Sequence, residues 1–255
     1  MSATTTISFA VLLAAAASGC AGTPILYEQR LVDLTHPFTE LTPSFPGSPP
    51  FVYERDARRR EGGEWVAEGS FRGTEQSGTH LEAPMHFAEG RHGTDEIPLR
   101  RLVGPIRVVD VRTRCHQDPR HAVSLADLQD HERLHGRIPS GAAVLVRTGW
   151  DQFWSTPERY FGVEGELRFP GLSPEAARAL VDKRVDLVGI DGPDLDPSDT
   201  AGSPAQRILA AANVPGLENL TGLGALPPLG ATLIALPMRI DRGSGGPTRV
   251  VAIVP

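Results

Sequence analysis

Residues 76–86 carry the densest group of polar, chemistry-bearing side chains, and they read Gln-Ser-Gly-Thr-His-Leu-Glu-Ala-Pro-Met-His. Side chains of an extended strand alternate between its two faces. If this segment is extended, Gln76, His80, Glu82 and His86 therefore lie on one face. Two imidazoles and a carboxylate on one face are ligands from which half of a metal site can be built. The alternative is a polar strand face on which His and Glu have no shared role.

Runs of β-branched and apolar residues on both sides of this segment predict a sheet. The runs are bounded by Gly or Pro, and several are apolar throughout, which is typical of central strands. They cover residues 30–35, 105–111, 143–148, 185–190, 232–236 and 249–254. Residues 37–50 are rich in Pro, Ser and Thr and therefore predict a loop.

Three segments between these runs predict helices. Ser124 begins the segment 124–135 as an N-cap, with an Asp three residues later in a variant of the capping box. Ser173 precedes Pro174, and this order is typical of a cap followed by the first helical residue. A third helix is expected over 206–213. The chain has no repeats and no internal Ser/Gly linker, so residues 30–255 are expected to form one domain. Strands mixed with a few helices predict an α/β (mixed α+β) fold with a mostly β core flanked by helices.

The first 22 residues differ in character from the rest. Residues 7–17 form an apolar stretch that is too short to span a bilayer as a helix but matches the core of a signal peptide. It leads into Ala17-Ser18-Gly19-Cys20, which resembles the lipobox of bacterial lipoproteins. We therefore predict that residues 1–22 are a signal peptide or lipoprotein signal and that the protein is exported to the envelope or periplasm, or secreted. The protein is then expected to attach to a membrane only through a lipid anchor at Cys20. Without a functional signal the protein is cytoplasmic.

Charge and composition restrict the classes of partner. The net charge of −6 argues against nucleic acid, because phosphate binding needs a clustered positive surface. The basic run 55–60 is interrupted by Asp56 and predicts a solvated loop. The second cysteine, Cys115, is expected to be a small hydrophobe without a role.

A run of acidic residues over 191–199 resembles a calcium-binding loop in composition but not in the spacing of its ligands. It lacks the Gly at the sixth position and the distal bidentate Glu of an EF-hand, and prolines interrupt it. We interpret Asp191, Asp194, Asp196 and Asp199 as parts of a structural turn.

The segment 76–86 resembles the His-Gly-Gly-Thr-His-Leu-Asp-Ala-Pro-x-His signature of the cyclase family, which includes bacterial kynurenine formamidases (arylformamidases) and isatin hydrolases. The likeness covers nearly the whole chain from Asp33 onward. It includes Phe45-Pro46-Gly47, Arg147-Thr148-Gly149-Trp150, Phe169-Pro170-Gly171-Leu172-Ser173 and Pro215-Gly216-Leu217-Glu218-Asn219. The chain is identified as a member of this family.

The resemblance implies roles for particular residues. In relatives the first His of the signature, the His after Gly-Thr and the Asp two residues later hold metal, and these positions are Gln76, His80 and Glu82 here. The last His of the signature transfers protons, and it is His86 here.

A later His and a Glu twelve residues beyond it complete the metal site of relatives. They correspond to Gln206 and Glu218. A Trp that lines the substrate pocket of kynurenine formamidases corresponds to Phe45.

These substitutions change the ligand chemistry. An amide oxygen is a harder and weaker ligand than an imidazole nitrogen, but it can bind calcium, magnesium or manganese. We therefore expect one divalent ion (Mn, Mg or Zn) at His80, Glu82 and Glu218, with Gln76 and Gln206 as weaker oxygen ligands. A zinc pair is disfavoured.

The family implies a metal-dependent hydrolase of a small amide or lactam. Two reactions are expected of it, hydrolysis of N-formylkynurenine to kynurenine and formate, or ring opening of the isatin type. His86 would take a proton from water and pass it to the leaving amine. The alternative is a catalytically inactive member that binds a small molecule or is attached to the envelope. The resemblance also implies a homodimer or homotetramer.

Overall fold

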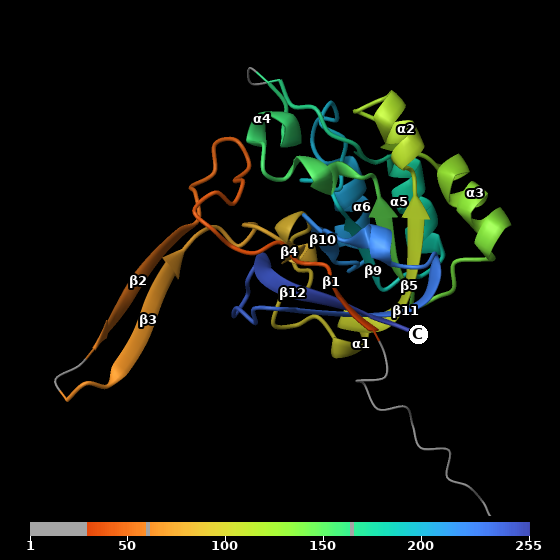
Figure 1. Cartoon of the computed structure of the whole chain (residues 1–255). Coiled ribbons are helices and arrows are strands. Elements are labelled where there is room, and N and C mark those ends of the chain that lie inside the picture. Colours follow the sequence, from red (N-terminus) through yellow and green to blue (C-terminus); the bar gives the residue numbers. More distant parts are fainter. Residues whose placement is uncertain (1–29, 60–61, 164–165) are drawn as a thin grey trace, which may run out of the picture.

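The computed structural model describes residues 30–59, 62–163 and 166–255 (Figure 1). The predicted signal at residues 1–22 lies outside these ranges. Within them, no helix has the length and apolar character needed to cross a membrane.

The core of the molecule is a sheet that closes on itself. Its strands follow the order β1-β12-β11-β5-β7-β9-β10-β4, and β4 pairs with β12 as well as with β10. This second pairing joins all of these strands except β1 into a ring. Neighbours from β5 to β10 run parallel, and the other pairs are antiparallel. The strands are β1 Arg30–Asp33, β4 His80–Glu82, β5 Val103–Asp110, β7 Ala143–Arg147, β9 Leu187–Ile190, β10 Gly216–Glu218, β11 Leu229–Pro237 and β12 Gly245–Val254.

The six strands predicted from apolar runs are confirmed as β1, β5, β7, β9, β11 and β12. The largest feature outside these predictions is a hairpin of β2 Val52–Arg59 and β3 Trp65–Arg72 that projects from the body of the protein (Figure 1). The prediction of a loop is therefore wrong for residues 55–59. Both faces of the hairpin are largely exposed, so its sequence lacks the alternation by which a half-buried strand is identified. A further small sheet pairs β6 Ala122–Val123 with β8 Gly171–Leu172.

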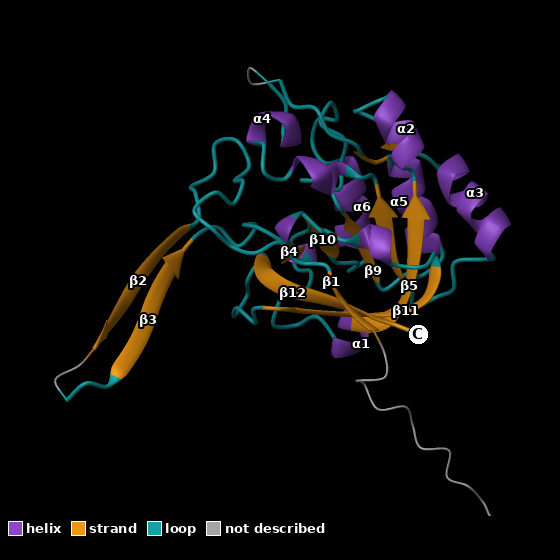
Figure 2. Ribbon diagram, viewed as in Figure 1, coloured by secondary structure: helices purple, strands orange, loops and turns teal. Residues whose placement is uncertain are grey.

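Helices gather beside the parallel strands, as Figure 2 shows for α3, α5 and α6. The predicted capping box is present, because Ser124 Oγ accepts from the Asp127 backbone N–H and the Asp127 carboxylate accepts from the Ser124 backbone N–H. The third predicted helix begins two residues earlier than expected, with Pro204 in its first turn. The helices are α1 Leu99–Leu102, α2 Arg112–Gln117, α3 Leu125–His135, α4 Pro157–Tyr160, α5 Pro174–Asp182 and α6 Pro204–Ala211, with 3-10 turns η2 Pro84–His86, η3 Trp150–Phe153 and η4 Leu223–Ala225.

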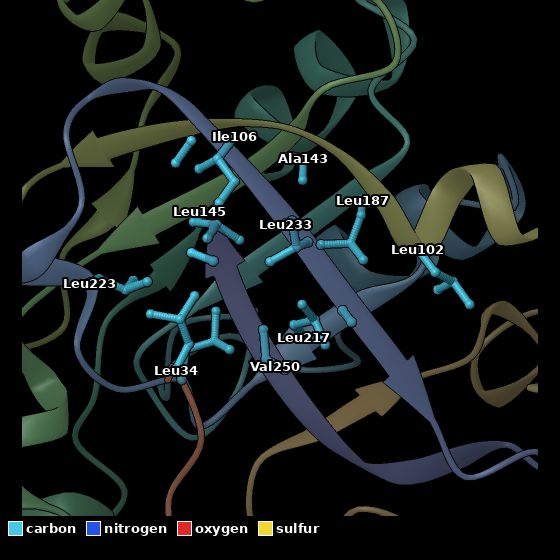
Figure 3. Packing of buried hydrophobic residues seen from close by; sticks show 14 of the residues in the cluster. Leu34, Leu102, Ile106, Ala143, Leu145, Leu187, Leu217, Leu223, Leu233 and Val250 are labelled. Atoms are coloured by element: carbon cyan, nitrogen blue, oxygen red, sulfur yellow. The ribbon is translucent and has the colours of Figure 1, made fainter. Parts of the chain in front are cut away.

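Alternation along the strands divides the apolar residues between two clusters. On β7, Ala143 and Leu145 belong to the cluster within the ring, whereas Val144 and Val146 belong to the cluster beneath the helices. Figure 3 shows the first cluster, where side chains from several strands meet. Full burial of a Leu or Val stabilises a fold by about 1.5–3 kcal/mol. The first cluster includes Leu81 of β4 and Leu217 of β10, and it therefore anchors both strands at the ring's closure, where the polar residues lie.

Candidate active site

Strand pairing brings the predicted site residues together. In the antiparallel register of β4 and β10, His80 lies opposite Glu218, and Glu82 lies opposite Gly216. His80 and Glu82 are two residues apart, so their side chains share a face. All three polar side chains are nearly inaccessible to solvent, with relative exposures of 1% for His80, 7% for Glu82 and 5% for Glu218.

The segment 76–86 is extended only at β4, so the expectation of one continuous strand face is wrong. Gly78 precedes β4 in a left-handed turn with φ 61°, and a Cβ there would lie 2.5 Å from Phe38 Cζ. After β4, Pro84 begins η2, and this turn returns His86 to the same cavity. The convergence of side chains that alternation predicted is therefore produced by two turns.

Gln206 links the two buried glutamates. Its Nε2 donates to Glu82 Oε2 and to Glu218 Oε1, at 2.9 Å in both cases. Glu218 Oε1 also accepts from the Leu195 backbone N–H at 3.0 Å. Gln206 lies in the first turn of α6, where its own backbone N–H donates to Asp196 Oδ2.

Burial and mutual repulsion shift the pKa values of the acidic groups. The pKa of Glu82 is raised well above its usual range, first by burial and then by the charges of Glu218 and Asp194. The pKa of Asp194 is raised by burial and by Glu218. Burial also lowers the pKa of His86, which favours the neutral imidazole near pH 7. A cation in this cavity would therefore relieve repulsion between carboxylates.

Two buried acceptor atoms test whether the residues fit a metal ion. His80 Nδ1 lies 3.0 Å from the Gly78 carbonyl oxygen, so Nδ1 carries the proton and Nε2 is a bare acceptor in the neutral ring. Nε2 has no hydrogen-bond partner and faces Glu218 Oε2, another acceptor, at 3.4 Å. Gln206 Oε1 is likewise buried without a partner.

These atoms would suit one hard divalent ion as ligands. A half-turn of the Gln206 amide would exchange its N–H and carbonyl groups, so that Oε1 faced both glutamates. His80 Nε2, two carboxylates and an amide oxygen then converge, and such mixed nitrogen and oxygen sets suit manganese or magnesium better than a zinc pair. As the side chains stand, the described part of the chain has no group of three or more His, Cys, Asp or Glu arranged to hold a metal. The residues fit one ion if Gln206 turns.

Gln76 lies on the other side of His86 from the glutamates. Its Nε2 is 3.3 Å from His86 Nδ1 and 3.2 Å from Ser244 Oγ. His86 Nε2 lies 3.7 Å from Glu82 Oε1. The hydrogen bonds of Gln76 thus go to His86 and Ser244, and its role as a metal ligand stays a prediction.

A cavity of about 250 Å³ contains all seven predicted site residues. Its lining combines aromatic and proline side chains with the two buried glutamates. Phe45 makes edge-on contacts with Phe161 and Phe169, with ring centroids 5.7 and 6.4 Å apart. The lining includes Pro43, Phe45, Gln76, His80, Glu82, His86, Phe87, Phe161, Pro193, Asp194, Gln206, Glu218 and Asn219.

The acidic run 191–199 divides between structure and site. Asp191 accepts from the backbone N–H groups of Thr148 and Gly149 at 2.7 and 2.8 Å, and Asp196 accepts from the first turn of α6, so the structural interpretation is confirmed for both. Asp194 instead lines the cavity. Its position directly beyond β9, at the carboxyl end of a parallel strand, is the signal that could have identified it.

Asn219 was also missed. It adopts φ 57°, and its Nδ2 donates to the Gly78 carbonyl oxygen at 2.8 Å. The Tyr160 hydroxyl donates to Asn219 Oδ1 at 2.7 Å, which fixes the orientation of the amide. Asn219 therefore holds the backbone carbonyl that orients His80, and no residue spacing in the sequence indicates this.

Comparison with known proteins identifies the family and the relatives of this chain. The family model named Cyclase matches residues 32–197. Isatin hydrolase from Roseibium aggregatum is 33% identical over 190 residues, which are 71% of this chain and 72% of that protein. Kynurenine formamidase from Salinibacter ruber is 32% identical over 221 residues, which are 87% of this chain and 96% of that protein.

Solved structures agree with these relatives. The crystal structure of an isatin hydrolase bound to the product analogue thioisatinate superposes with a TM-score of 0.84 at 29% identity and covers 90% of this chain and 94% of that one. A structure described as a potential metal-dependent hydrolase with cyclase activity has a TM-score of 0.69 at 26% identity, covering 89% and 98%. The named relatives are hydrolases. Because the family model spans most of the described residues, this chain belongs to the cyclase family.

Proposed function

We propose that this protein is a metal-dependent hydrolase of small aromatic amides or lactams that works with one divalent ion. The observation that carries the proposal is the pair of buried, unpartnered ligand atoms, His80 Nε2 and Gln206 Oε1, beside two buried glutamates. Unpartnered buried polar atoms are rare in folded proteins and call for a physical explanation. The names of the relatives give the reaction class.

His80, Glu82, Glu218 and, after its amide turns, Gln206 would hold the ion. Such an ion polarises a carbonyl group and makes water a better nucleophile. The chain itself supplies the remaining functions. The Gly78 carbonyl keeps the Nδ1 proton of His80, so that Nε2 stays available. His86, a third of whose side chain is exposed, lines the cavity, where it could contact the reacting carbonyl or the leaving amine.

The cavity lining supports a neutral aromatic substrate. Phe45, Phe87 and Phe161 offer ring faces and edges to a flat molecule. No Lys or Arg is among the described residues of the lining, whereas Glu82, Asp194 and Glu218 are. A substrate carboxylate would meet this acidic group without a basic partner. The carboxylate of N-formylkynurenine therefore lacks a partner in this lining, although its ammonium group could face the acidic side chains, whereas the neutral lactam isatin needs no charged partner.

Turnover of both compounds after chelation tests the proposal. The chelated protein should be inactive, and manganese, magnesium or zinc should restore hydrolysis, with isatin preferred. Unimpaired hydrolysis in the chelated protein would contradict the metal requirement. Failure to hydrolyse either compound with any of the three ions would contradict the proposed reaction class.

Paired substitution tests the ligand positions. Gln76→His together with Gln206→His should raise the affinity for zinc, because imidazole nitrogens bind zinc more strongly than the amide oxygens available at these two positions. Gln117→His, at the exposed end of α2, is the matched control and should leave zinc affinity unchanged. Equal zinc affinity in the double variant and the control would show that these positions do not lie at the metal.

One observation favours a second candidate, a catalytically inactive small-molecule-binding protein. The Gln206 N–H group already satisfies both glutamates, so the cavity is stable without a cation. A protein of this kind would bind aromatic lactams in the presence of chelator, with no product formed under any metal condition.

We further propose a homodimer in which the β2–β3 hairpin contacts the partner. A two-stranded hairpin alone is only marginally stable in water. This one exposes Tyr53, Trp65 and Phe71, with relative exposures of 41%, 63% and 59%. Light scattering should give twice the chain mass, and Trp65→Lys should reduce it toward the monomer. A monomeric wild-type protein would contradict the proposal.

Export with lipidation at Cys20 also remains our proposal, resting on the signal-like residues 1–22. Mass spectrometry of the amino terminus from bacterial membranes tests it. A diacylglycerol-modified Cys20 is expected, and an intact Met1 on soluble protein would contradict it.

A further inference from the structure

Glu75 and Ser244 form a polar pair, and Ser244 contacts Gln76, a residue of the cavity lining. The backbone N–H of Ser244 donates to Glu75 Oε2 at 2.9 Å, and the Ser244 hydroxyl donates to the same oxygen. A hydroxyl has one hydrogen and two lone pairs. The hydrogen of Ser244 is therefore committed to Glu75, and its oxygen can only accept from other groups.

This commitment sets the orientation of Gln76. Because Ser244 Oγ is an acceptor, the Gln76 group that lies 3.2 Å from it must be the amide nitrogen. The second hydrogen of that nitrogen is directed at His86 Nδ1, 3.3 Å away. Gly245 leaves room for this arrangement, since a Cβ there would lie 2.9 Å from Gln76 Nε2.

The orientation of Gln76 in turn selects one tautomer of His86. An imidazole nitrogen that accepts a hydrogen bond is unprotonated, so the proton of the neutral ring resides on the other nitrogen. Here that is Nε2, which faces the glutamate side of the cavity, 3.7 Å from Glu82 Oε1. An edge contact with Phe87, at 4.5 Å between ring centroids, limits rotation of the ring.

We infer that Glu75, Ser244 and Gln76 are positioning residues that hold His86 as a hydrogen-bond donor through Nε2. As a donor, His86 stabilises negative charge that develops on the substrate carbonyl oxygen, and it neither gains nor loses its own proton. This role replaces the proton-transfer role implied by the resemblance, because the only basic nitrogen of the ring is occupied by Gln76. The catalytic part of the inference rests on the proposed function, whereas the tautomer does not.

Nuclear magnetic resonance of ¹⁵N-histidine-labelled protein reads the tautomer directly, without substrate. His86→Asn identifies the His86 signals by their loss. Wild-type His86 should show an unprotonated Nδ1 and a protonated Nε2. Gln76→Glu replaces the donor by an acceptor and should protonate Nδ1, and Ser244→Ala should shift the population in the same direction. Ser140→Ala, a remote serine at the surface, is the matched control and should leave the His86 signals unchanged.

The kinetic counterpart is a fall in kcat of about tenfold in Ser244→Ala with little change in KM, as expected for the loss of one oriented hydrogen bond. A protonated Nδ1 in the wild type, or an unchanged His86 in Gln76→Glu, would overturn the inference even if hydrolysis is observed. The predicted tautomer in a protein that hydrolyses neither isatin nor N-formylkynurenine would instead reject the proposed function and leave the positioning of His86 intact.

Discussion

Replacing Gln206 by Met removes the N–H group that joins the two buried glutamates while keeping the length of the side chain. Two hydrogen bonds of 2.9 Å to carboxylates are lost. Hydrogen bonds to charged groups contribute about 1.5–3 kcal/mol each, so the metal-free protein should lose about 3–6 kcal/mol of unfolding free energy. Protonation of Glu82, whose pKa is already raised by burial, sets the upper limit of this loss.

Thermal unfolding in chelator measures the effect. For a chain of this length, 1 kcal/mol corresponds to about 2–4 °C, so Tm should fall by on the order of 10 °C. Gln117→Met, on the exposed face of α2, is the matched control and should change Tm by less than about 2 °C. Equal Tm values for the two variants would refute the view that Gln206 neutralises the glutamates in the metal-free protein.

Three further substitutions test the framework and the cavity. Gly78→Ala should destabilise the protein by more than about 2 kcal/mol in denaturant unfolding, because it combines a left-handed φ with a clash against Phe38. Gly202→Ala is the control, because Gly202 has φ 79° and open space around it, and it should lower the unfolding free energy by only about 1 kcal/mol. Equal losses would show that the clash is relieved. Phe45→Ala should raise KM for isatin several-fold with little effect on kcat, and an unchanged KM would remove Phe45 from the substrate wall. Burial raises the pKa of Asp191 to about 7 from its usual value of 3.8, so the folded state binds the extra proton between these two pH values. The stability that Asp191 contributes is therefore present at low pH and lost as pH rises toward 7. Urea unfolding from pH 5 to pH 8 should show this decline in the wild type and not in Asp191→Asn, and parallel profiles would contradict it.

Local sequence patterns were sufficient for most of the fold. The apolar runs that became β7 and β9 are buried on both faces, so their composition alone identifies them, whereas β5 is buried mainly in its second half. Ser124 and Ser173 mark helix starts by chemistry that depends only on neighbouring residues. The closure of the sheet through β4 and β12 could not be predicted in this way, because it pairs residues far apart in sequence.

The site was predictable to the extent that it repeats a family signature. The seven residues carried over by resemblance do line one cavity. Asp194 and Asn219 were missed because their importance comes from interactions between segments far apart in sequence, namely the charge of Glu218 acting on Asp194 and the hydrogen bond from Asn219 to Gly78. The positions of Gln76 and Gln206 relative to His86 and the glutamates likewise depend on side-chain rotations that spacing along the chain does not determine.

Calorimetric titration of the chelated protein with manganese tests the central claim most directly. It counts the ions bound per chain, and comparison with a ligand variant shows where they bind. The wild type should bind one ion per chain, with Tm rising in parallel, and Glu218→Gln should lose this binding because it removes a buried carboxylate ligand. Two ions per chain, no binding, or equal binding by Glu218→Gln would contradict a single ion held by His80, Glu82, Gln206 and Glu218.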